Sequence, residues 1–186
     1  MDNTKKPGSA QVAFKWTLIY IVTSIVLTYL WQFLGIGTTS PLRYISFIPF
    51  IAFMFLAQKE YSEKLGGFMT FGEGFVAGLL FAVFSGVLGA IFSYIYLAVL
   101  SPQVWQQSLD ATRAALESKG TLSSDQIDQA MNITAKYGLI LTLVGGIVVM
   151  PIVGAIISLI GAAIFKKEKS ILDIERDASN FADPVS

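Results

Sequence analysis

The feature that most constrains this chain is a stretch of twenty-six residues without a charge, residues 75–100. A helix rises about 1.5 Å per residue and the hydrocarbon core of a bilayer is about 30 Å thick, so a helix of this length can cross a membrane with some tilt. Thr70, Gly72 and Glu73 precede the stretch and suit the start of a helix. We therefore predict a membrane-spanning helix over residues 71–100.

Small residues recur at every fourth position of this predicted span: Gly74, Gly78, Ala82, Gly86 and Ala90. Residues four apart lie on one face of a helix, so this face is a smooth groove that another helix can approach to backbone contact. We expect the groove to pack against a helix of the same chain or of a second copy.

Three further apolar segments predict spans over residues 12–34, 42–58 and 137–165. The second is the weakest, because only fifteen uncharged residues, 44–58, separate two cations, and fifteen helical residues cover roughly 22 Å. A re-entrant hairpin is the alternative for this segment. The pattern predicts an all-α fold, an integral membrane four-helix bundle that forms a single domain over residues 1–186.

Two prolines fall within these spans, Pro49 in the second and Pro151 in the fourth. Proline removes a backbone hydrogen bond and clashes with the carbonyl four residues earlier, so both positions are predicted kinks, the later one between Ile147 and Pro151. Gly154 belongs to a second small-residue face, on the fourth span, and is a predicted helix-packing residue.

Residues 101–136 are polar and predict a helical hairpin outside the hydrocarbon. Pro102 after a serine favours a helix start, and this helix should run to about Lys119. Ser123 and Gln126 form a capping-box pattern, which predicts a second helix from about Ser124.

The distribution of basic residues predicts the orientation. With four spans, nine basic residues lie on the side of the termini and four on the opposite side: Lys5, Lys6, Lys15, Lys59, Lys64, Lys166, Lys167, Lys169 and Arg176 against Arg43, Arg113, Lys119 and Lys136. The positive-inside rule then places both termini in the cytoplasm and the hairpin outside. The tail over residues 166–186 should contain a short helix over 170–178.

Composition supports a membrane protein and narrows its chemistry. Hydrophobic residues make up 54% of the chain and charged residues 14%, against about 25% charged in soluble domains. Cysteine and histidine are absent, which removes the common nucleophile and base arrangements and most zinc sites. We expect no enzymatic activity, no cofactor and no metal, and the zero net charge argues against nucleic acid as a partner.

Glu73 is the candidate functional carboxylate, because it lies at the border of a span. It suits the positive end of a helix dipole, and it also suits a proton or cation path. Lys15 lies at the same depth on the first span, so we predict a Lys15–Glu73 ion pair.

The segment from Leu65 to Phe75, with its Thr-Phe-Gly-Glu-Gly motif, the Tyr94-Ile95-Tyr96 exit and Pro102 resemble a known family. The family comprises small four-span bacterial membrane proteins, found mainly in the Bacteroidota and catalogued as a domain of unknown function. The resemblance covers nearly the whole chain and implies a bacterial inner-membrane setting.

Two functions fit these observations. The first is a non-enzymatic scaffold or accessory subunit of a membrane complex, which would use the hairpin or its small-residue faces to bind a protein partner or a second copy within the lipid bilayer. The alternative is a small transporter or channel, as a single chain or as an oligomer, for which the prolines and glycines at membrane depth are the support.

Overall fold

The computed structural model describes residues 8–36 and 40–167, and this part of the chain is all-α. Its elements are, in order, α1 (Ser9–Phe33), the 3-10 helix η1 (Pro41–Ser46), α2 (Phe47–Lys64), α3 (Phe71–Ile95), the π-helix η2 (Tyr96–Leu100), α4 (Pro102–Lys119) and α5 (Ser124–Phe165). The predicted tail helix over residues 170–178 lies outside the described residues.

Three helices are long and apolar enough to cross a membrane. They are α1 with 25 residues, α3 continued by η2 with 30 residues, and α5 with 42 residues. They correspond to the first, third and fourth predicted spans, and they indicate a multi-pass membrane protein.

The predicted second span, residues 42–58, differs from expectation. Its residues 42–46 belong to η1 and its residues 47–58 to α2, whose last turns carry Lys59, Glu60 and Lys64. Because of these charges α2 is not among the three long apolar helices. Pro49 lies in the first turn of α2, where proline is tolerated, and the kink predicted there stays a prediction.

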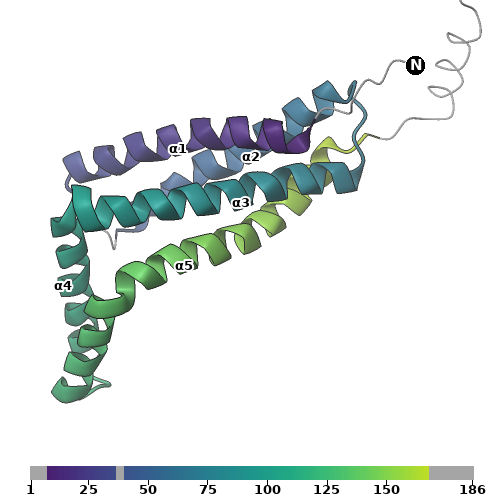
Figure 1. Ribbon diagram of the computed structural model, residues 1–186. Coiled ribbons are helices and arrows are strands. Elements are labelled where there is room, and N and C mark those ends of the chain that lie inside the picture. Colours follow the sequence, from purple (N-terminus) through teal and green to yellow (C-terminus); the bar gives the residue numbers. More distant parts are fainter. Residues whose placement is uncertain (1–7, 37–39, 168–186) are drawn as a thin grey trace, which may run out of the picture.

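The sequence predicted a hairpin helix from about Ser124 and a fourth span over residues 137–165, but the structure joins them in one helix, α5. It runs unbroken from Ser124 to Phe165, and neither glycine nor proline occurs between Ser124 and Tyr137 to interrupt it. Its first turns lie beside α4 and its later turns beside α3 (Figure 1). Pro151 lies within the helix, and the bend predicted there stays a prediction.

α3 is the central helix and packs against α1, α2 and α5; in Figure 1 it lies between α1 and α5. A buried aromatic group joins three of these helices. The rings of Tyr20 and Phe50 lie 5.5 Å apart, and so do those of Phe50 and Phe81. In lipid, such packing contacts rather than water exclusion hold helices together.

The ends of the helices meet in two groups. At one end, which we call the basic end, the backbone of Met69 exchanges hydrogen bonds of 3.0 and 2.9 Å with Lys167, which joins the start of α3 to the end of α5. At the opposite end Trp31 donates to Ser46 Oγ at 2.9 Å and so joins α1 to η1. The helices therefore alternate in direction along the chain.

Candidate functional site

The small-residue face of α3 lies directly against α5. Cβ atoms added to Gly74, Gly78 and Gly86 would lie 3.2, 2.3 and 3.0 Å from atoms of α5. From the other side, a Cβ added to Gly154 would lie 2.1 Å from the Cβ of Ala82. The two helices approach so closely that a side chain at these glycine positions would force neighbouring atoms to move. The small-residue face of α3 therefore packs against a helix of the same chain.

One polar side chain reaches into this contact. Gln58 of α2 is fully buried, and its Nε2 donates to the carbonyl of Gly74 at 3.0 Å and to the carbonyl and hydroxyl of Ser158 at 3.0 and 3.1 Å. The Ser158 hydroxyl donates in turn to the carbonyl of Phe75 at 2.8 Å. Gln58 therefore ties α2 to both α3 and α5.

Sequence reasoning did not select Gln58, because it stood at the edge of the weakest predicted span. A signal was present in the spacing. Gln58 follows Phe50 and Met54 at intervals of four and lies on the same helical face, which is the buried face of α2. A polar residue on an apolar face of a membrane helix is a reason to expect an interhelical hydrogen bond.

Lys15 is paired with Glu60 of α2, where we had predicted Glu73. Glu60 also accepts from Trp16 Nε1 at 2.7 Å and pairs with Lys64 at 3.1 Å. The hydrogen bond from Lys15, followed by those from Lys64 and Trp16, holds the pKa of the Glu60 carboxyl below its ordinary value. The correction has a simple cause: α2 packs against α1 and brings its own carboxylate to Lys15.

Glu73 forms a capping box at the start of α3. Its Oε2 accepts from the backbone N–H and the hydroxyl of Thr70, both at 2.9 Å, and Thr70 Oγ1 accepts from the backbone N–H of Glu73 at 3.3 Å. The carboxylate thereby satisfies a helix-terminal donor and faces the positive end of the helix dipole. The structural role of Glu73 thus has a defined geometry, and its transport role stays a prediction.

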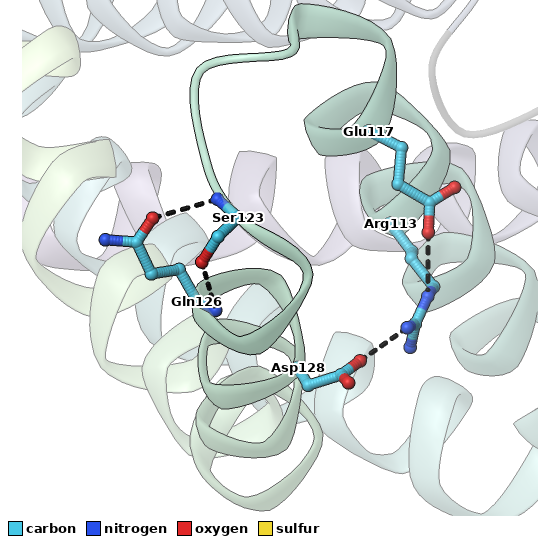
Figure 2. A network of polar contacts seen from close by, with 5 residues as sticks. All are labelled: Arg113, Glu117, Ser123, Gln126 and Asp128. Carbon is cyan, nitrogen blue, oxygen red and sulfur yellow. Dashed lines mark hydrogen bonds and ion pairs between the residues drawn. The ribbon is translucent and has the colours of Figure 1, made fainter.

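α4 and the first turns of α5 are joined by charged side chains (Figure 2). Arg113 donates to Glu117 on its own helix at 3.0 Å and to Asp128 on α5. Gln126 Oε1 accepts from the backbone of Ser123 at 2.9 Å, and Ser123 Oγ accepts from the backbone of Gln126 at 3.4 Å, which is the predicted capping box at the start of α5.

A cavity of about 490 Å³ lies between α1, α3 and α5, near the middle of the long helices. Hydroxyl-bearing and small residues form much of its wall, among them Ser24, Ser85, Gly89, Thr142 and Gly145. Sequence analysis favoured packing for the small residues of α3 and kept a transport path as the alternative. The described residues contain no cluster of side chains that could hold a metal ion.

Comparison with known families matches residues 15–167 to the family described as "Protein of unknown function (DUF4199)". The chain belongs to the DUF4199 family. No curated protein and no solved structure matches it.

The DUF4199 match begins at Lys15 and ends at Lys167, so it spans everything from the Lys15–Glu60 pair to the Met69–Lys167 bridge. The glycine contact between α3 and α5, the hairpin and the cavity all lie inside the DUF4199 domain. The resemblance to a family of unknown function is thereby confirmed, and its bacterial membrane setting stays a prediction.

Proposed function

We propose that this DUF4199 protein is a non-enzymatic membrane protein that acts by binding a protein partner, as a scaffold or accessory subunit of a membrane complex. The observation that carries this proposal is the construction of the hairpin formed by α4 and the first turns of α5. Because α5 is one helix of 42 residues, it links the hairpin directly to the bundle. A partner held by the hairpin would therefore be held in a defined position relative to the membrane.

The inner side of the hairpin is built to keep its two helices together. The Trp105 ring lies so close to α5 that a Cβ added to Gly138 would be 2.6 Å from it. Leu109 and Ile127 are buried. The opposite face of α4 carries exposed residues such as Asp110 and Ala114, and it is the surface we assign to a partner.

The proposed topology has four crossings. The uncharged residues 44–46 of η1 contribute about 2.0 Å each and residues 47–58 of α2 about 1.5 Å each, which together give about 24 Å. A cation precedes and another follows this stretch in the sequence, and long cationic side chains at the ends of a span can extend their charges to the headgroups and so complete the crossing. Four crossings bring both termini to the basic end, where Lys15, Lys59 and Lys64 lie, and the positive-inside rule assigns that end to the cytoplasm of a bacterial inner membrane.

Affinity purification of the full chain from its native membranes tests the proposal. We expect a companion protein in fixed stoichiometry with the wild type. Ala114→Arg places a long charged side chain on the exposed face of α4 and should release the companion, whereas Gln11→Arg, on the exposed start of α1, should retain it. A chain that purifies without a companion contradicts the proposal.

The cavity favours the second candidate function, a small transporter or channel, because it is lined by the glycines and Met150 that precede Pro151 in α5, and helices interrupted by glycine or proline at membrane depth often line substrate sites. The two functions are separated by reconstitution of the purified chain in liposomes. Ion or solute flux through the chain alone, lost when Gly145→Leu fills part of the cavity, would support the transporter and overturn the accessory subunit.

A further inference from the structure

We propose that the cavity between α1, α3 and α5 is a binding site for a small neutral molecule that is mostly apolar and carries one hydroxyl group. The proposal is independent of the accessory function, because the cavity lies in the bundle and the partner surface lies on the hairpin. Its volume of about 490 Å³ falls within the range of small-molecule sites, about 300–1,000 Å³.

Three of the hydroxyl groups in the wall of the cavity are already committed as donors. Ser24, Thr28 and Thr142 each donate to a carbonyl of their own helix at 2.8 Å. A hydroxyl that has donated its proton still has lone pairs to offer. These three residues can therefore accept a hydrogen bond from a bound molecule.

Ser85 differs from the other hydroxyl-bearing residues of the wall. Its side chain is 1% exposed, and its Oγ has no hydrogen-bond partner in the described part of the chain. A buried hydroxyl without a partner costs free energy, and in native proteins such a group calls for an explanation. Rotation of the Ser85 side chain about its Cα–Cβ bond would turn the hydroxyl toward the cavity, where a ligand hydroxyl would supply the missing partner, as donor, acceptor or both.

The remaining wall decides the class of ligand. Phe92, Val149 and Met150 line the cavity along with its glycines, and its lining residues include no Asp, Glu, Lys or Arg. A charged ligand would lose its hydration without gaining a counter-charge, at a high cost in free energy. An uncharged molecule with a hydrocarbon body and one polar group matches both the apolar wall and the hydroxyls.

The position of the cavity indicates entry from the bilayer. α2 contacts α5 beyond Pro151, where Gln58 bonds Ser158 and a Cβ on Gly154 would lie 3.4 Å from the Met54 methyl. On the other side of Pro151, Met150 and Gly146 line the cavity, and α2 contributes no residue to it. The cavity therefore begins where α2 and α5 part, within the depth of the spans.

Photolabelling of the full-length protein in lipid nanodiscs, with a diazirine-bearing octanol as the probe, tests the site. We expect mass spectrometry to find the label concentrated on cavity residues such as Tyr20 and Met150. Competition with 1-octanol should exceed competition with n-octane, because the two differ only in the hydroxyl. In Ser85→Ala, the advantage of octanol should fall by about fivefold, the equivalent of one ordinary hydrogen bond.

Cavity-filling variants provide the control for location. A Cβ on Gly145 would meet nothing within 4 Å and one on Gly89 only a methyl group at 3.9 Å, so Gly145→Leu and Gly89→Leu should fold and abolish labelling of the cavity. Ala163→Leu, exposed near the end of α5, should leave labelling unchanged. Label spread evenly over lipid-facing residues, or unaltered in the filled variants, would overturn the proposal.

The stability of Ser85→Ala without ligand gives a second readout that does not depend on the probe. If the hydroxyl is unpaired in the empty protein, its removal should leave the midpoint of thermal unfolding unchanged or raise it. A lowered midpoint would mean that Ser85 has a structural partner, and the assignment of its hydroxyl to a ligand would be wrong.

Discussion

The side-chain amide of Gln58 donates to both the carbonyl and the hydroxyl of Ser158, at 3.0 and 3.1 Å, across a contact in which both residues are fully buried. The same amide nitrogen also bonds the carbonyl of Gly74 at 3.0 Å. These hydrogen bonds join α2, whose last turns are charged, to α3 and α5, the two most apolar helices of the bundle. They explain how α2 stays packed in the bundle although its own hydropathy is modest.

The first prediction concerns the coupling between Gln58 and Ser158. Gln58→Leu removes the hydrogen bonds of Nε2 but also removes the unpaired Oε1, so its single effect mixes terms of opposite sign. A double-mutant cycle with Ser158→Ala isolates the interaction. We expect a coupling of about 0.5–1.5 kcal/mol in the free energy of unfolding, measured in mixed micelles.

Gln11→Leu, on an exposed position of α1, is the control and should not couple to Ser158→Ala. If the Gln58 and Ser158 substitutions were additive, the bond between Gln58 Nε2 and the Ser158 hydroxyl would contribute nothing to stability.

The second prediction compares two glycines of α5. Gly154→Ala introduces a Cβ 2.1 Å from that of Ala82, and such overpacking should cost about 1–3 kcal/mol. A Cβ on Gly145 would meet nothing within 4 Å, so Gly145→Ala should be neutral or should gain up to about 1 kcal/mol from helix propensity. Equal unfolding free energies of the two variants would contradict the close contact of α3 and α5.

The third prediction distinguishes the two possible partners of Lys15. Lys15→Met combined with Glu60→Gln should show a coupling of about 0.2–1 kcal/mol, as expected for a partly exposed pair. The same cycle with Glu73→Gln should show none, and Glu73→Gln alone should be mild because glutamine also serves in a capping box. A larger coupling of Lys15 to Glu73 than to Glu60 would restore the pair that the sequence suggested.

The fourth prediction is a pH dependence that comes from Glu60. Its pKa in the folded protein lies below the ordinary value of 4.5, so the unfolded chain binds the proton more tightly. The stabilisation is therefore fully present above pH 4.5 and is lost as pH falls below 4.5 through the folded pKa. Unfolding free energies measured from neutral to acid pH should fall less steeply in Glu60→Gln than in the wild type, and identical slopes would exclude Glu60 as the source.

The fifth prediction is the topology. Reporter fusions after Lys119 and at the C-terminus should give opposite signals, with the C-terminus cytoplasmic, because α5 lies between them. Only η1 and α2 separate a fusion after Gly35 from one after Gly66, so these two should also give opposite signals if α2 crosses the membrane with η1. Like signals after Gly35 and Gly66 would show that α2 does not cross.

Local patterns anticipated the features that depend on neighbouring residues. Pro102 begins α4, Gly120 ends it with a φ of 63°, and Ser123 and Gln126 cap α5 as the spacing predicted. The sequence predicted a division between hairpin and fourth span that the structure does not have, because a rise in hydropathy after residue 136 does not interrupt a helix that contains neither glycine nor proline between Ser124 and Tyr137. The sequence shows the charged residues of α2, but it does not show which residues of other helices they contact.

The sequence alone determined that this protein lies in a membrane, because the length and hydropathy of residues 75–100 and 137–165 leave a bilayer as the suitable solvent, and it indicated a close-packing face from Gly74 to Ala90. Only the tertiary structure decided which helix meets that face, that Lys15 pairs with Glu60, and that Gln58 bonds Ser158. Spacing along the chain fixes which residues share a face of one helix. The relative rotation and depth of two helices depend on all their contacts together, and these select the pairs between them.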